Sequence, residues 1–553
     1  MINLTILIII PIIFIGLILI ISGNTTIIRK VETNSLRHMV YLEENHSMIS
    51  YVVRKYFSKI IKKNLNFIPS LLTVSFWHEN MIWQKLKESK DKSELLAIIL
   101  KKIGLCLSLM LFLLIGLFWF KHRRTTINYE VLNNKDINEE LWNMDMTLAL
   151  DGLSLPFVLL VGFILPIVYL SNWSTIDSLD IYYVLIIILL ELLLIVVFLV
   201  IDLIMFYVFF ESILPPLFIL IGLYGASQKF RAGYYLFLYT LLGSMFMLLS
   251  FVKIAGDTAS SFFEGYGSNN VFEMLQEIIW IALFVSFSVK TPLVPVHIWL
   301  PLAHSDANVS GSIILASIVL KLALYGFLRI LIGVFALATT GLTPLFLGLC
   351  SLSLLYSSWT TIRQFDLKVL VAYSSIAHMA SSLLGTFSDT LYGIIGSIIF
   401  GLAHGFVSPG LFIIVGAILY DRCGSRIINY YRGLSNILPF FALFFLLLVF
   451  GNMGVPLTAN FMGEFLSLLG AYQQNIFIAS IGALSVILSA VYSIFMYNRV
   501  TGGSLSIYIH TIPDIFRKEF FILLPLILLT LLLGVTTQFL TSDIEFSLSN
   551  FLL

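Results

Sequence analysis

The sequence has few cysteines and no nucleotide-binding motif, and both absences limit what the chain can do. Its 553 residues include three cysteines, Cys106, Cys350 and Cys423, which are far apart and form no C-x-x-C pair. This spacing argues against an iron–sulfur cluster, a covalently attached haem and a disulfide framework. No G-x-G-x-x-G or G-x-x-x-x-G-K-[ST] motif occurs either, so the chain offers no nucleotide site. Any redox chemistry linked to it must take place on another protein.

Charge is also scarce and almost balanced. Lys and Arg number 32 against 31 Asp and Glu, which gives a net charge of +1 and argues against a nucleic-acid partner. Charged residues make up 11% of the sequence and hydrophobic residues 59%, with a mean hydropathy of +0.98. These values lie far outside the range of soluble domains and predict a polytopic membrane protein.

Apolar runs long enough to cross a bilayer as helices, at roughly 17 residues or more, set the expected fold. The first lacks a preceding basic residue and a cleavage site, so we interpret it as a retained helix. An all-α fold with about fourteen transmembrane helices is therefore predicted, with spans at 2–21, 99–120, 152–171, 181–201, 203–222, 233–252, 277–296, 309–332, 341–357, 369–386, 391–419, 436–458, 474–497 and 519–540.

A polar insert, residues 23–98, separates the first two spans. Within it, "SYVVRKYFSKIIKKNL" places apolar residues at helical spacing opposite a basic face. One interpretation is a basic helix on an anionic membrane surface. The other is a solvated helix packed on a partner subunit.

Short loops predict the orientation, because Lys and Arg are retained on the inner side. The loops after spans 4, 10 and 12 have no Lys or Arg, and the loop after span 6 has only Lys253. The basic loop after span 2 runs against the pattern. The odd loops are therefore expected inside and both termini outside, on the basis of the basic residues after spans 5, 9, 11 and 13, which are Lys229, Arg231, Arg363, Lys368, Arg422, Arg426, Arg432, Arg499, Arg517 and Lys518.

Four ionisable residues stand alone in apolar helices: Glu211 in span 5, Lys290 in span 7, Lys321 in span 8, and Glu464 in span 12 or just past a break in it. A charge at mid-membrane costs about 2.5–3.5 kcal/mol on insertion scales, so residues kept there often mark an ion or proton path. Structural ion pairs that only orient helices are the competing interpretation. A buried lysine whose carboxylate partner moves can switch its protonation, as a proton relay requires.

Four histidines lie in or beside the spans. His378 and His404 could pass a proton between charged sites, since imidazole both gives and accepts protons near neutral pH. Hydrogen-bonded packing is the alternative for each. His297 and His304 are separated by Pro301, so a shared helical face is poorly supported and no metal site is assigned.

Two helix breaks are predicted at comparable positions. Pro292 and Pro295 follow Lys290, and Gly451, Gly454 and Pro456 precede Glu464. Such matching breaks indicate an inverted-repeat transporter. The expected repeats are spans 4–8 and 9–13, with broken helices at spans 7 and 12.

Long motifs of this chain resemble the antiporter-like proton-pumping subunits of respiratory complex I, in their mitochondrial form. The resemblance covers about residues 151–500, and it is carried by "DGLSLPFVLLVGFILPIVYLSNW" from 151, "FYVFFESILPPLFILIGLYG" from 206, "VKTPLVPVHIWLPLAHSDANVSGSIILASIVLKLALYGFLR" from 289, "RQFDLKVLVAYSSIAHMASSLLG" from 363, "GLAHGFVSPGLFIIVGAILYDRCGSR" from 401 and "GEF" from 463.

The resemblance implies roles for six residues. Glu211 and Lys290 match the carboxylate–lysine pair of the first half, Lys321 the central lysine, His378 and His404 relay histidines, and Glu464 the acid of the second half. The expected function is proton translocation coupled to quinone reduction in other subunits. A multisubunit cation/proton antiporter subunit is the alternative, and a scaffold with idle charges is the third.

The resemblance also implies surroundings. NADH, FMN, iron–sulfur clusters and ubiquinone would be bound by other subunits and no cofactor by this chain. Its partners would be the neighbouring antiporter-like subunits 2 and 5 and anionic phospholipid such as cardiolipin. The location would be the mitochondrial inner membrane, with both termini on the intermembrane-space side, although the sequence also fits a bacterial origin.

The expected organisation is a first helix (1–22), the insert on the matrix side (23–98), helices 2–4 (99–202), a first-half channel core (203–332), a second-half core (333–500), and a loop with the last helix (501–553). Asp306 and Asn308 depart from the family pattern, in which Glu or Gln and Pro are more frequent.

Overall fold

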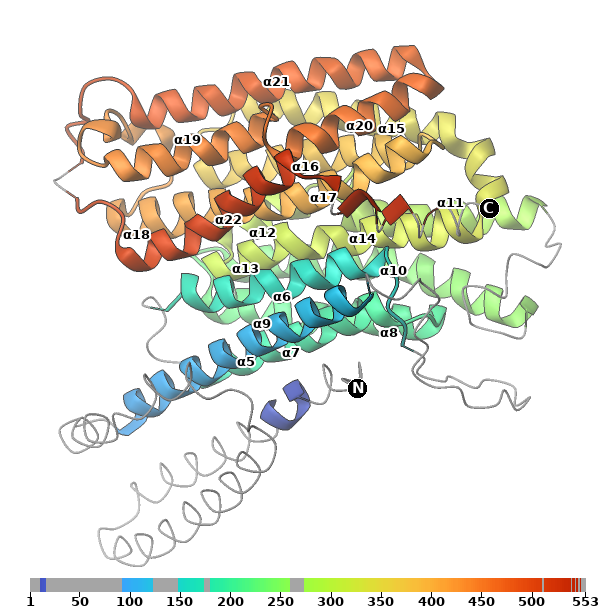
Figure 1. Ribbon diagram of the computed structural model, residues 1–553, viewed down its shortest axis with the longest axis horizontal. Helices are drawn as coiled ribbons and strands as arrows, with labels where there is room; N and C mark the ends of the chain where they lie inside the picture. The colour runs from blue at the N-terminus through green and yellow to red at the C-terminus, as the bar shows by residue number, and fades with distance from the viewer. Residues whose placement is uncertain are drawn as a thin grey trace, which may run out of the picture. The chain divides into compact units, whose positions relative to one another are not determined.

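The structure, a computed structural model, describes residues 10–15, 92–122, 148–173, 180–258, 273–509 and 512–538, with 540–542, 544–545 and 548. Its helices (Figure 1) are α5 (Lys92–His122), α6 (Ser154–Ser171), α7 (Asp180–Leu199), α8 (Leu203–Ser212), α9 (Leu214–Tyr224), α10 (Lys229–Thr258), α11 (Glu273–Lys290), α12 (Trp299–Asp306), α13 (Val309–Ile314), η2 (Leu315–Val319), α14 (Leu320–Gly326), η3 (Phe327–Ile332), α15 (Ala336–Ile362), α16 (Leu367–Thr386), α17 (Leu391–Phe412), η4 (Ile413–Leu419), α18 (Tyr420–Cys423), η5 (Ile428–Tyr430), η6 (Leu434–Asn436), α19 (Pro439–Met453), α20 (Ala459–Gln474), α21 (Ile476–Thr501) and α22 (Arg517–Val535).

The predicted all-α polytopic fold is confirmed. Within the described ranges, eleven helices are long and apolar enough to cross a membrane. They correspond to expected spans 2–6, 8–11, 13 and 14. Of the remaining three, span 1 lies almost wholly outside the described residues, and spans 7 and 12 are broken helices. The basic helix expected within 23–98 also lies outside the described residues and stays a prediction.

The two breaks occur where the proline and glycine pattern predicts them. The helix α11 ends at Lys290, and α12 begins at Trp299. Prolines in between cannot donate a backbone hydrogen bond, so the helical ladder stops. In the second break α19 ends at Met453, and Gly454 follows with φ +67°, a conformation that glycine adopts without strain. Glu464 therefore lies on α20, a separate half helix that begins five residues after Gly454.

Side-chain caps fix where neighbouring helices begin. The carboxylate of Asp202 accepts from the backbone N–H of Ile204 at 2.8 Å and starts α8, and Asp366 accepts from the N–H of Lys368 at 2.9 Å and starts α16. Each cap satisfies a donor that the first helical turn leaves free. The unusual Asn308 has the same role, since its side chain accepts from Gly311 N–H at 2.9 Å and starts α13.

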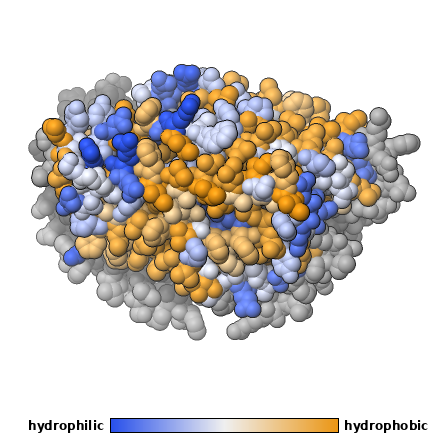
Figure 2. Space-filling view, turned by 90° about the horizontal axis from the view of Figure 1, so that it is seen from above, coloured by the Kyte–Doolittle hydropathy of each residue, from blue (hydrophilic) through white to orange (hydrophobic). Residues whose placement is uncertain are grey.

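The residues form two compact units. The larger comprises Met1–Pro11, Gly104–Ile176 and Ile186–Leu553, and it holds every predicted site residue. Its centre consists of two segments, Val309–Ile332 and Leu391–Cys423, and the most apolar stretch of each is wholly buried. In the helix Arg517–Val535, by contrast, only 28% of the most apolar stretch is buried. Figure 2 shows an apolar band across the middle of one face, with hydrophilic residues gathered towards its two sides. Such a band suits contact with lipid.

Candidate functional site

Lys321 lies in the wholly buried centre of the larger unit. Its side chain is 0% exposed. The residue lies two positions after the end of the π-helix η2, and such turns are often found at functional sites. The ammonium nitrogen donates to the carbonyl oxygen of Ala316 at 2.6 Å and lies 2.8 Å from Nδ1 of His404. Among the described residues, no carboxylate forms an ion pair with Lys321. Because two positive charges so close repel strongly in a buried site, Lys321 and His404 are suited to share one proton.

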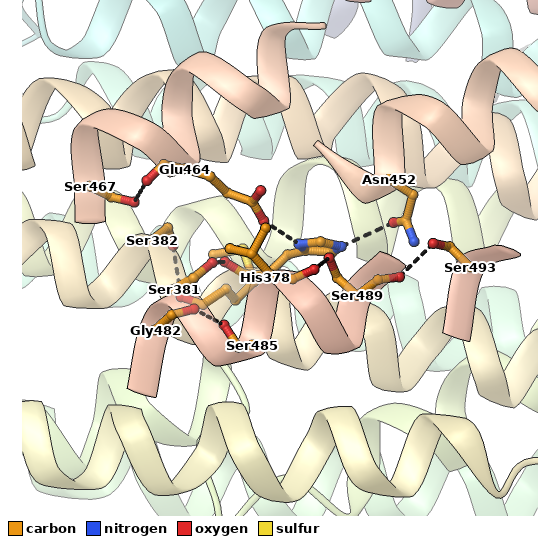
Figure 3. Close-up of polar contacts among 12 residues, drawn as sticks. His378, Ser381, Ser382, Asn452, Glu464, Ser467, Gly482, Ser485, Ser489 and Ser493 are labelled. Carbon is orange, nitrogen blue, oxygen red and sulfur yellow. Dashed lines mark hydrogen bonds and ion pairs between the residues drawn. The ribbon is translucent and has the colours of Figure 1, made fainter. Parts of the chain in front are cut away.

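His378, on α16, connects this pair to Glu464. Its ring centre lies 5.7 Å from that of His404. Figure 3 shows the imidazole between two side chains, with Nε2 3.1 Å from Oδ1 of Asn452 and Nδ1 3.6 Å from Oε1 of Glu464. An amide oxygen only accepts hydrogen bonds, so this arrangement assigns a proton to Nε2 and turns Nδ1 towards the carboxylate.

Glycines bring α20 close enough to place Glu464 there. A Cβ atom on Gly463 would lie 2.5 Å from Cα of Phe400 on α17, so only a glycine permits this approach of the two backbones. A Cβ atom on Gly454 would overlap the carboxylate of Glu464. The break therefore does more than end α19, because its glycine leaves room for the acid.

Lys290 is held at the first break by groups other than a carboxylate. Its ammonium donates to the carbonyl oxygen of Phe210 at 3.1 Å and lies 3.7 Å from the centre of that aromatic ring. Glu211, the next residue on α8, interacts with Lys290 electrostatically, and its Oε1 is buried without a hydrogen-bond partner. The indole of Trp299 donates to the carbonyl oxygen of Val289 at 2.8 Å, a backbone group near the end of α11.

The six predicted site residues thus form two groups. Lys321, His404, His378 and Glu464 follow one another in a row that we call the relay. Lys290 and Glu211 form the second group. The helices of the two groups touch at Gly326 in α14, where an added Cβ would lie 2.6 Å from the ring of Phe287 in α11.

His297 and His304 have separate surroundings, as their sequence spacing suggested. His297 meets the ring of Tyr356 edge-on with centroids 5.4 Å apart, whereas His304 stacks on Phe412 at 4.6 Å. In the part of the chain that the structure describes, no group of three or more His, Cys, Asp or Glu side chains could hold a metal ion.

Sequence reasoning missed the partners of His378. Besides Asn452, the hydroxyl of Tyr492 lies 3.4 Å from Nε2. Three buried serines of α21, at four-residue intervals, lie around the same site in Figure 3: Ser485, Ser489 and Ser493. Their spacing places them on one helical face, and this periodicity is a signal that the sequence does contain.

Two further buried charges were also missed. Glu191 in α7 is 0% exposed, and neither carboxylate oxygen has a hydrogen-bond partner. Arg329 in η3 pairs with Asp151 at 2.5 Å. Both lie inside or beside predicted spans, so the rule that led to Lys321 also applies to them.

Comparisons with known proteins agree with this arrangement. The family model described as NADH:quinone oxidoreductase/Mrp antiporter, TM, matches residues 201–489. The chain is 43% identical over 451 residues to NADH-ubiquinone oxidoreductase chain 4 of Mycosarcoma maydis, covering 81% of this chain and 93% of that protein. It is 42% identical over 455 residues to the chain 4 protein of Arabidopsis thaliana, covering 82% and 91%.

Solved structures show the same architecture. A chain of respiratory complex I from Thermus thermophilus with bound NADH superposes with a TM-score of 0.71 and 29% identity, over 82% of this chain and 98% of that chain. A chain of the Mrp complex from Dietzia sp. DQ12-45-1b reaches 0.72 at 17% identity, over 82% and 93%, which is a likeness of fold alone. The chain belongs to the NADH-ubiquinone oxidoreductase chain 4 family of antiporter-like, multi-pass membrane subunits.

Proposed function

We propose that this chain translocates protons as a membrane-arm subunit of a mitochondrial NADH:ubiquinone oxidoreductase. The observation that carries the proposal is the relay, in which a lysine, two histidines and a glutamate, all with buried side chains, follow one another through the interior of the larger unit. Charges are costly at this depth unless they are used or paired. The order of these four groups, each of which can bind one proton, supports their use in proton transfer.

The steps follow the distances. A proton on Lys321 passes to Nδ1 of His404 across 2.8 Å. It then reaches His378 through water, since the two ring centres are 5.7 Å apart and Nε2 of His404 is buried without a partner. From Nδ1 of His378 it moves to Glu464 across 3.6 Å. Asn452 orients the imidazole throughout.

Lys290 and Glu211 would act as the input switch. Glu211 favours a proton on Lys290, and movement of the carboxylate away weakens that preference. The contact of Phe287 with Gly326 gives the two lysine-bearing helices a shared packing surface. A change at the first group would therefore displace the helix that carries Lys321.

The wider assignment rests on the family. NADH, FMN, iron–sulfur clusters and ubiquinone would be bound by other subunits, and the neighbours would be subunits 2 and 5 together with anionic phospholipid such as cardiolipin. Both termini would face the intermembrane space. Residues 203–332 and 333–500 would form the two half-channel cores, between the helices of 99–202 and the last segment, 501–553.

Lys321→Met in the assembled complex tests the proposal. Loss of a positioned proton carrier is expected to lower NADH-driven proton pumping by about tenfold or more. Native gels verify assembly, and Lys253→Met, which changes an exposed lysine, serves as the control. A Lys321→Met complex that assembles and pumps normally would leave the relay without a function and favour a scaffold with idle charges.

The cation/proton antiporter is the competing assignment, and the Mrp likeness supports it at the level of fold alone. Co-migration with NADH dehydrogenase activity on a native gel distinguishes the two. A chain that migrates apart from that activity and exchanges cations for protons on its own is an antiporter.

A further inference from the structure

A third group of charged side chains surrounds the start of α16, apart from the relay and from the first break. Lys368 is buried, with 3% of its surface exposed, and its ammonium donates to the carbonyl oxygen of Ala307 at 2.7 Å. It interacts electrostatically with Asp306, Asp366, Asp421 and Arg426. We call Lys368 and the three carboxylates the α16 cluster. Asp306 and Asp366 are half-buried and Asp421 is exposed, so the cluster leads from the surface to a buried lysine.

Backbone hydrogen bonds hold the segments of the α16 cluster together. The N–H of Leu367 donates to the carbonyl oxygen of Arg426 at 2.9 Å, and the N–H of Ile428 donates to that of Phe365 at 2.9 Å. The side chain of Arg426 donates to the carbonyl oxygen of Ser305, at the end of α12. Three segments far apart in the sequence are thereby fixed around Lys368.

His304 is the residue that relates the α16 cluster to the relay. Its imidazole is 0% exposed, and neither ring nitrogen has a hydrogen-bond partner. It interacts electrostatically with Lys368 and Lys321, and also with His404. Burying a polar ring without partners is costly unless water or a moving proton occupies the position.

Lys321 and Lys368 both lie beside π-helical turns. Lys321 donates to Ala316 within η2, and the stem of Lys368 lies against Gly416 in η4, where an added Cβ would be 3.2 Å from its Cε atom. Phe412, on which His304 stacks, directly precedes η4. Turns of this type commonly occur at functional sites.

We propose that the α16 cluster is the proton-uptake site for Lys321, and that His304 carries the proton between Lys368 and Lys321. The proposal rests on the relay function proposed above. The carboxylates collect a proton at the surface, Lys368 takes it, and His304 accepts it on one ring nitrogen and releases one from the other through water. Each step moves one proton and no electrons. The loops concerned follow spans 7, 9 and 11, so uptake would occur from the matrix side.

His304→Phe tests the carrier, because phenylalanine retains a ring to stack on Phe412 and has no nitrogen. Proton pumping per assembled complex is expected to fall about tenfold, as in Lys321→Met. His297→Phe is the matched control, since His297 is also a buried histidine in the same segment and lies against Tyr356. It is expected to pump normally.

Lys368→Arg separates proton transfer from structural support. Arginine keeps the positive charge and can still donate to Ala307, but it does not release its proton. We expect assembly to persist and pumping to fall severalfold. If Lys321→Met loses pumping while His304→Phe or Lys368→Arg pumps normally, the uptake route is wrong and the relay stands. If Lys321→Met pumps normally, the relay itself is wrong.

Discussion

Three buried lysines, Lys290, Lys321 and Lys368, are each stabilised by dipoles rather than by a contacting carboxylate. Lys290 uses a carbonyl oxygen and an aromatic ring, Lys321 a carbonyl oxygen and an imidazole, and Lys368 a carbonyl oxygen. A carboxylate in contact with each ammonium would hold its proton firmly, because loss of that proton would leave the negative charge of the carboxylate buried without a partner. A carbonyl oxygen, an imidazole or an aromatic ring stabilises an ammonium less strongly than a carboxylate does. When the proton leaves, such a neutral partner carries no charge and can bind water instead. This choice of partners supports the proposed release of protons from these lysines.

Asn452 is the residue that orients the His378 ring, and its replacement gives a prediction at this scale. Asn452→Leu keeps a similar volume but removes the nearer of the two oxygens at Nε2 and leaves only the Tyr492 hydroxyl, 3.4 Å away. The ring then loses its preferred tautomer, and we expect proton pumping to fall roughly threefold to tenfold in assembled complex.

The control is Ser353→Ala on α15, since Ser353 is also buried and its hydroxyl donates only to its own helix, at Cys350, 2.7 Å away. Normal pumping by Asn452→Leu would show that Glu464 and the Tyr492 hydroxyl are enough to orient His378.

At the scale of elements, the sequence predicts helices and breaks well because their causes are local. Prolines 292 and 295 and the glycines before Glu464 act within their own turns, and the structure interrupts the helices there. The half helix α20 was not predicted as a separate element. The polar residues of α20, including Glu464, make its sequence less apolar than that of a complete transmembrane span. In the structure Glu464 is sheltered because α20 packs closely against α17.

The contacts of the relay could not be derived from local pattern. Lys321 and His404 are 83 residues apart, and His378 and Asn452 are 74 apart. The motif resemblance identified the residues, but not the order in which they meet. The π-helical turns have no compositional signature, so their position beside Lys321 and Lys368 emerges only from the packing.

Gly463 provides a prediction about the packing of α20 on α17. In Gly463→Ala the added methyl would lie 2.5 Å from Cα of Phe400, a backbone atom that cannot move aside. Overpacking of this kind costs about 1–3 kcal/mol and should displace Glu464 from His378. We expect a lower melting temperature of the complex and reduced pumping.

Gly348→Ala on α15 is the matched control, because an added Cβ there meets nothing within 4 Å. Alanine is also the better helix former, so Gly348→Ala should be neutral or slightly stabilising. Equal losses in the two variants would attribute the effect to alanine itself and not to the contact between α20 and α17.

At the scale of the whole molecule, two members of the relay lie in its most buried helices. The segments Val309–Ile332 and Leu391–Cys423, which carry Lys321 and His404, are wholly buried in their most apolar stretches. The outer helices bury much less and present large apolar side chains, for example Leu242 and Leu249, with 64% and 66% of their surface exposed. These outer helices therefore present apolar side chains outwards, and the polar groups of the relay face one another within the protein.

The ion pair of Arg329 with Asp151 links this interior to the segment that precedes α6. The two residues are 178 positions apart, and their side chains are 5% and 12% exposed. Burial by itself would raise the pKa of Asp151. The Arg329 guanidinium and the hydrogen bonds from Ser154 outweigh this effect and hold the pKa below its usual value.

The sign of that shift gives the last prediction. A carboxyl group whose pKa is lower in the folded state stabilises the fold fully above its unfolded pKa, about 3.9, and loses the contribution as the pH falls through the folded value. Asp151→Asn removes the carboxylate that pairs with the buried Arg329, at a cost of about 3–5 kcal/mol in unfolding free energy. We expect the loss in melting temperature relative to the native chain to be equal at pH 7 and pH 5, because Asp151 is ionised at both. A loss that shrinks markedly at pH 5 would mean that the native carboxyl is already protonated there, and that Arg329 does not hold its charge.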